Sequence, residues 1–190
     1  MNKIFCLETE WDQTIHDLKK KSTVLSLLDF LQNAQKKKIE YSFRQVATSS
    51  DFEYYISHLL QPGYASFDNI YLCFHGCPRK ICFANKNDSD LDLLTFAEEH
   101  NGIFEGRNVH FGSCSTLRMT NDEVLRFKYL TKARMITGYT KDVSFTPSFI
   151  FETWLLNTIC LKPGFAGKRI KNLAEKEMSY YSNLFGFESY

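Results

Sequence analysis

The sequence has no surplus of charge of either sign and no long apolar run. Its 190 residues include 23 Lys and Arg against 22 Asp and Glu, a net charge of +1. Proteins that bind nucleic acid or anionic membranes through charge carry a large basic excess, so we expect neither partner. No apolar run approaches the roughly 18–20 residues of a membrane-spanning helix, and Glu8 and Glu10 interrupt the first apolar stretch, which argues against a signal peptide. We therefore expect a cytoplasmic protein.

Linkers and internal repeats are also missing. The four prolines are scattered, and no Pro-, Gly- or Ser-rich stretch divides the chain. A chain of this length is typical of one domain, and a hydrophobic content of 44% supplies a sizeable core. The sequence thus predicts a single domain over residues 1–190.

Six cysteines stand at positions 6, 73, 77, 82, 114 and 160. A domain of this size does not depend on disulfides for a stable core, and no export signal is seen, so we interpret all six as reduced thiols. Most are expected to be buried, because free cysteine behaves as a small hydrophobic residue.

Short apolar strands alternate with segments of helical periodicity along the chain. This alternation predicts an α/β fold with a mainly parallel sheet sandwiched by helices, joined by right-handed crossovers. Sites in such sheets lie outside the carboxyl ends of the strands. The expected strands are 3–8, 39–46, 69–74, 80–84, 107–113 and 134–139, and the expected helices are 24–31, 50–60, 91–100, 121–129, 147–160 and 168–184.

Two of these strand ends carry residues suited to nucleophilic catalysis. An apolar strand leads into His75 and Gly76, and a second strand leads through Gly112-Ser113 into Cys114. If the two strands are neighbours, the imidazole and the thiol emerge at one edge of the sheet. Cysteine attacks as the thiolate, and a nearby imidazole can take its proton and return one to a leaving amine. The backbone amides of Gly76 and Cys114 are then candidate donors of an oxyanion hole.

These motifs resemble the caspase-like cysteine peptidases, and most closely their CHAT subgroup, which is related to caspases and separase. The resemblance rests on His75-Gly76 and on Gly-Ser-Cys114-Ser 39 residues later, and it extends over about residues 65–160, through the strand 133–139 and the Phe-rich helix 148–156. It implies a caspase–hemoglobinase-like fold, a His/Cys dyad that hydrolyses peptide bonds, and no metal or organic cofactor. It also implies a regulated bacterial stress or defence protease with a protein or peptide substrate and a regulatory protein partner.

The chain departs from the family pattern at several positions. Ser113 precedes the nucleophile and Ser115 follows it, where many members have Ala before it and Glu or Gln after it. Cys77-Pro78 directly after His-Gly is also unusual, and the first 60 residues carry no motif of the family.

Substrate preference has one candidate residue in the sequence. In arginine-preferring relatives such as separase, an acidic residue after the strand that follows the nucleophile receives a basic P1 side chain. Asp142 stands at a comparable place, and a carboxylate there would pair with a guanidinium. The alternative is a solvated aspartate in a loop.

Three further alternatives remain open. The chain could be a catalytically inactive caspase-like interaction module. Cys73, Cys77 and Cys82 could bind zinc together with His75, although their spacing differs from that of zinc ribbons. His110 precedes Cys114 by four residues on one strand, about 13 Å away at ~3.3 Å per residue, and is expected to be a packed or surface residue rather than the base.

Overall fold

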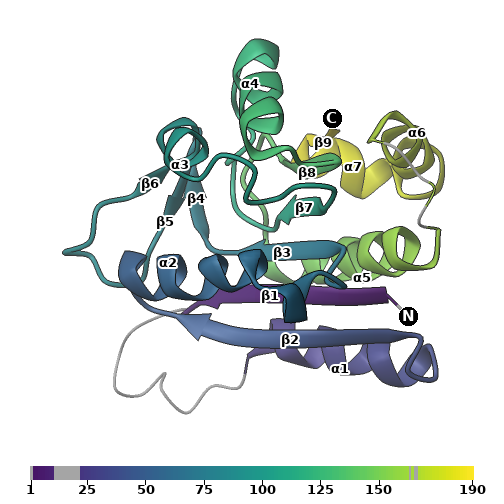
Figure 1. The fold of residues 1–190 in the computed structure, drawn as a ribbon. Helices are drawn as coiled ribbons and strands as arrows, with labels where there is room; N and C mark the ends of the chain where they lie inside the picture. Colours follow the sequence, from purple (N-terminus) through teal and green to yellow (C-terminus); the bar gives the residue numbers. More distant parts are fainter. Residues whose placement is uncertain (1, 11–21, 163, 165–166) are drawn as a thin grey trace.

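The structure, a computed structural model, describes residues 2–10, 22–162, 164 and 167–190. Its centre is a six-stranded sheet in the order β2-β1-β3-β7-β8-β9, in which only β9 runs antiparallel to its neighbour (Figure 1). The predicted mainly parallel sheet is therefore confirmed. Its strands are β1 (Asn2–Thr9), β2 (Ile39–Val46), β3 (Asn69–Cys73), β7 (Asn108–Phe111), β8 (Met135–Tyr139) and β9 (Phe187–Ser189).

Helices cover both faces of this sheet. One face packs against α2 (Ser49–Ser57), α3 (Leu93–Glu99) and α4 (Asn121–Thr131). The other face packs against α1 (Thr23–Ala34), α5 (Phe145–Leu161), α6 (Gly167–Glu177) and α7 (Ser179–Phe185). Two short 3-10 helices, η2 (His58–Leu60) and η3 (Pro62–Tyr64), follow α2. The sandwich of helices around a mainly parallel sheet, consistent with a caspase-like α/β fold, agrees with the sequence-based prediction.

The alternation of side chains along the strands explains this double packing. In β3, Ile70 and Leu72 belong to the core beneath α2, α3 and α4, whereas Tyr71 and Cys73 face the opposite core beneath α1 and α5. Successive residues of a strand point to opposite faces. A strand that is covered on both faces is therefore mostly apolar, as residues 70–73 of β3 are.

A second, smaller sheet leaves the main one at Phe74. It consists of β4 (His75–Cys77), β5 (Lys80–Cys82) and β6 (Leu91–Asp92), all antiparallel. Because β6 occupies residues 91 and 92, the helix expected from residue 91 begins at Leu93 instead. Asp92 is its N-cap, and its carboxylate accepts hydrogen bonds from the N–H groups of Leu94 and Thr95.

The C-terminal segment also differs from the prediction. The expected helix 168–184 is divided at Met178, which has non-helical backbone angles (φ −131°, ψ 36°) between α6 and α7. Gly186 then ends α7 in the left-handed region (φ 57°), and β9 pairs with β8 at the edge of the sheet.

The chain order creates a switch point at the carboxyl ends of β1 and β3. From β1 the chain crosses through α1 to β2 on one side, and then through α2 to β3 on the other side of β1. Ligand sites of open α/β sheets lie in the crevice outside such a point.

None of the helices in the described ranges is long and apolar enough to cross a membrane.

Candidate active site

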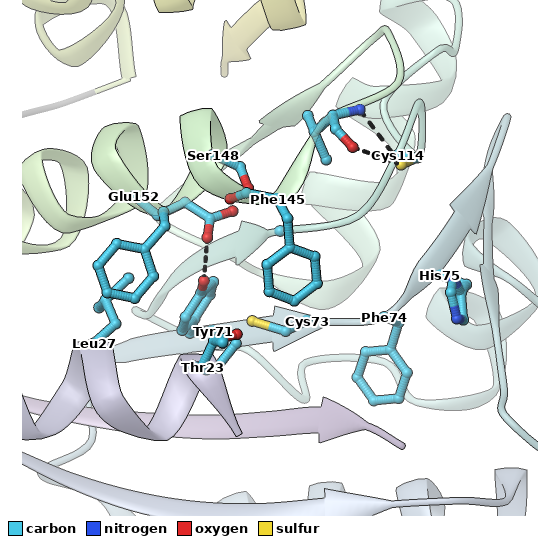
Figure 2. A pocket seen from close by; sticks show the side chains of 14 residues that line it. Thr23, Leu27, Tyr71, Cys73, Phe74, His75, Cys114, Phe145, Ser148 and Glu152 are labelled. Carbon is cyan, nitrogen blue, oxygen red and sulfur yellow. Dashed lines mark hydrogen bonds between the residues drawn. The ribbon is translucent and has the colours of Figure 1, made fainter. Parts of the chain in front are cut away.

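A cavity of about 240 Å³ opens at this switch point (Figure 2). Its lining comes from the start of α1, the end of β3, the segment after β7 and the start of α5. Most of the wall is apolar, and the polar groups include His75, Cys114 and Glu152. In the view of Figure 2, His75 and Cys114 lie toward one end of the cavity and Glu152 toward the other. An apolar pocket with a few convergent polar groups is the usual form of a small binding site.

The two strand ends singled out in the sequence do meet. Strands β3 and β7 are parallel neighbours, with Leu72 opposite Phe111. Beyond them, the backbone N–H of Phe74 donates to the Ser113 hydroxyl (3.2 Å). His75 and Cys114 directly follow these two contacting residues and line the same cavity. The predicted juxtaposition of the imidazole-bearing and thiol-bearing segments is therefore present.

Gly76 is packed directly against the segment that carries Cys114. A Cβ atom at Gly76 would lie 2.4 Å from the carbonyl oxygen of Cys114 and 2.3 Å from the hydroxyl of Thr116. Neither distance is compatible with a side chain. A glycine is thus required at position 76 for the close approach of this backbone to the segment that carries Cys114. This steric requirement is separate from the oxyanion role that we expect for the Gly76 amide.

Cys114 is held in a tight turn between β7 and α4. Its thiol is half-buried, accepts a hydrogen bond from the Val143 N–H (3.4 Å) and donates to the Val143 carbonyl (3.7 Å). The next residue, Ser115, has a left-handed backbone (φ 46°), and its N–H donates to the carbonyl of Lys141 (2.9 Å). These contacts anchor the thiol segment to the loop after β8.

Most of the other thiols are unsuited to nucleophilic attack. Cys6, Cys73 and Cys160 are buried, whereas Cys77, Cys82 and Cys114 are half-buried, so half of the cysteines are buried rather than the predicted majority. Burial raises the pKa of Cys6, raises that of Cys73 well above its usual range, and raises that of Cys160 to about 12. Burial and the neighbouring Cys77 and Asp90 also raise the pKa of Cys82 to about 12. These four thiols stay protonated at neutral pH.

His75 is exposed at the first position of β4, at the rim of the cavity. Asp142, the predicted P1-binding residue, is exposed as well and accepts a hydrogen bond from the Ser115 hydroxyl (3.2 Å). It therefore lies beside the residue that follows Cys114. It is outside the lining of the described cavity.

The carboxylate of Glu152 is a feature of the site that the sequence analysis missed. Glu152 is only 6% exposed and accepts hydrogen bonds from the hydroxyls of Tyr71 (2.5 Å) and Tyr139 (3.1 Å). The ring of His110 stacks on Tyr71, and its Nε2 lies 3.7 Å from Glu152. His110 is 2% exposed, with Nδ1 at 3.0 Å from the Thr137 hydroxyl, so it is the packed residue that was expected.

A signal for Glu152 is present in the sequence. It is the single charged residue of the 17-residue helix α5, and charged residues are rarely found fully buried unless they are paired. Gly112 leaves room for it, because a Cβ there would lie 2.9 Å from Glu152 Oε1 and 2.9 Å from the Tyr71 ring.

The four-residue zinc set that the sequence left open as an alternative is not assembled. Cys73 is the last residue of β3 and packs in the core beneath α1 and α5. Cys77 and Cys82 belong to the small sheet. The bend at Phe74 separates the two groups. Within the described part of the chain, the cysteine, histidine and acidic ligand atoms that come together are those of Cys77, Cys82 and Asp90.

Comparison with known proteins places the chain in a family without assigning a reaction. No curated protein matches it significantly. A family model described as a family of unknown function, DUF6642, matches residues 1–183, which is nearly the whole chain. The protein is therefore a member of the DUF6642 family.

Proposed function

We propose that this protein is a cysteine endopeptidase of the caspase-like type, with His75 and Cys114 as its catalytic dyad. The observation that carries the proposal is that an exposed imidazole and a half-buried thiol, 39 residues apart in the sequence, line one cavity at the switch point of the sheet. Switch points are where α/β enzymes bind their substrates. The resemblance of the His-Gly and Gly-Ser-Cys-Ser segments to CHAT peptidases supports the same reaction.

In this reaction the Cys114 thiol gives its proton to His75, and the thiolate attacks the carbonyl carbon of the scissile peptide. The negative charge that develops on the carbonyl oxygen is stabilised by the amides of Gly76 and Cys114. His75 then protonates the leaving amine as the C–N bond breaks, which leaves a thioester on Cys114. Water attacks the thioester, releases the carboxylate product and restores the thiol. No step requires a metal or an organic cofactor.

The cavity favours a substrate with a long cationic P1 side chain. Its walls are apolar, its buried carboxylate is Glu152, and none of the described lining residues is Lys or Arg. The Glu152 carboxylate already accepts hydrogen bonds from Tyr71 and Tyr139, and an ammonium or guanidinium would add a group of opposite charge beside it. A Cβ atom at Gly112 would lie 2.9 Å from Glu152 Oε1, and Gly112 is two residues before Cys114. The carboxylate is therefore close to the start of the segment that carries the thiol, and both residues line the cavity.

Labelling with a peptide electrophile tests the dyad. A peptidyl acyloxymethyl ketone is expected to modify one thiol per chain, at Cys114, as detected by intact mass and peptide mapping. Cys6, Cys73 and Cys160 should stay unmodified because they are buried and their pKa values are raised. The reaction should slow strongly in His75→Ala. Equal labelling in wild type and His75→Ala, or labelling elsewhere than Cys114, would contradict the proposal.

The P1 preference distinguishes the two candidate carboxylates. Fluorogenic peptides with Arg or its uncharged isostere citrulline at P1 are expected to differ in kcat/KM in favour of Arg. Glu152→Gln should reduce this ratio by about tenfold or more, since a hydrogen bond to a charged group contributes about 1.5–3 kcal/mol. The matched variant Asp142→Asn should leave it unchanged. The reverse result would assign the P1 contact to Asp142, as the sequence resemblance suggested.

The second candidate function is a caspase-like interaction module without activity. The unusual Cys77-Pro78 and Ser115 positions favour it, because they depart from the peptidase pattern. An unreactive Cys114 in a folded protein would support this alternative.

If the peptidase is active, the resemblance further suggests a regulated role in bacterial stress or defence, with a regulatory protein partner.

A further inference from the structure

The small sheet, which begins at His75, holds a cluster of potential metal ligands that takes no part in the proposed reaction. Cys77 lies at the end of β4, Cys82 at the end of β5, and Asp90 directly before β6. Their ligand atoms, two sulfurs and one carboxylate oxygen, all lie within 4.8 Å of one another. Both cysteines are half-buried and Asp90 is exposed, so an ion from solvent can reach the cluster.

The separation of the two sulfurs fits one ion in particular. The Sγ atoms of Cys77 and Cys82 are 3.8 Å apart. In a tetrahedral site with Zn–S bonds of about 2.3 Å, two sulfurs are separated by about 3.8 Å. A disulfide would instead require a sulfur separation of about 2.05 Å. The pair is therefore already spaced as two zinc ligands.

The strand register places both thiols on one face of the small sheet. Cys82 is directly opposite His75 in the antiparallel ladder, and Cys77 is two residues beyond His75 on the same strand. Directly opposite residues and alternate residues of a ladder share a face. Asp90 joins them from the third strand's side. A bound ion would thus connect all three strands of a sheet whose strands have only two or three residues each.

We propose that Cys77, Cys82 and Asp90 bind a zinc ion that fixes the small sheet and thereby the position of His75. Thiolates are preferred zinc ligands, zinc also binds aspartate carboxylates, and a water would complete the tetrahedron. Binding releases one proton from each thiol. The site is distinct from the zinc set considered from sequence, because Asp90 replaces Cys73 and His75. It does not depend on peptidase activity.

Titration of the 190-residue chain with Co²⁺, a coloured substitute for zinc, tests the site. We expect one Co²⁺ per chain with a thiolate-to-metal charge-transfer band, displacement by Zn²⁺, and a Tm that rises with Zn²⁺. Cys77→Ser and Cys82→Ser should lose the band, whereas Cys114→Ser should retain it. Asp90→Asn, at an exposed position that leaves both thiols in place, should bind Co²⁺ more weakly and show a smaller Zn²⁺-induced rise in Tm.

Three results would overturn the zinc site. The first is the absence of a charge-transfer band in reduced wild-type protein. The second is its loss in Cys114→Ser, which would assign the metal to the catalytic thiol. The third is unchanged Co²⁺ affinity in Asp90→Asn together with an unchanged Zn²⁺ effect on Tm, which would exclude the carboxylate. Circular dichroism of each variant separates the loss of a ligand from the loss of the fold.

Discussion

Cys114→Ala is expected to abolish peptide cleavage and to leave the protein folded. The variant removes the sulfur that would attack the substrate carbonyl, and no neighbouring group replaces it. Knocking out the nucleophile of a catalytic unit typically costs about 10³-fold or more in kcat. The thiol is half-buried and its hydrogen bonds go to the Val143 backbone, so the Tm should change little. Steady-state cleavage of a P1-Arg fluorogenic peptide measures the loss.

His75→Ala should reduce kcat by about 10²–10⁴-fold, the usual contribution of a general acid–base group. Because His75 is exposed, its removal leaves no cavity in the core. His58→Ala is the matched control, since His58 lies in η2 with its ring nitrogen near the Tyr54 carbonyl and outside the cavity lining. It should cleave at the wild-type rate.

The two variants also test whether the residues act together. If His75 serves only through Cys114, the double variant should be no less active than Cys114→Ala alone, because groups that act as a unit are not additive. Full cleavage by Cys114→Ala would refute the mechanism. Equal losses in His75→Ala and His58→Ala would show that the effect of the imidazole is unspecific.

The placement of His75 and Cys114 in the lining of one cavity could be predicted from sequence because it depends on strand ends alone. An apolar strand that precedes each residue, with helical segments between, brings both to the carboxyl edge of a parallel sheet. The register of β3 and β7 confirms that the strands are neighbours. Such an argument needs the direction and order of the strands, and no detail of side-chain packing.

The parts that could not be predicted depend on tertiary contacts. Periodicity does not show that the chain bends at Phe74, so Cys73 was grouped with Cys77, although they belong to different sheets. The orientation of α5, which brings Glu152 to Tyr71 and Tyr139, follows from packing against the sheet. The three residues of β9 are too few for an alternating pattern to be recognised.

Gly76→Ala is expected to inactivate the enzyme and to destabilise it. Its Cβ would lie 2.4 Å from the Cys114 carbonyl oxygen and 2.9 Å from Ser113 Cβ, so one of the two loops must shift. Overpacking of this kind costs about 1–3 kcal/mol in the free energy of unfolding. A displacement of about 1 Å between reacting groups can cost about 10²-fold in rate. We therefore expect a lower urea midpoint and a cleavage rate reduced about 10²-fold or more.

Two comparisons identify the cause of this loss. Gly63→Ala adds the same methyl group where no atom lies within 4 Å, and it should keep both stability and activity. Combining Gly76→Ala with Thr116→Ala removes the hydroxyl at 2.3 Å but leaves the Cys114 backbone contact, so activity should stay low. Recovery in this double variant would mean that the Thr116 side chain, and not the approach of the thiol-bearing backbone, is what requires a glycine at position 76.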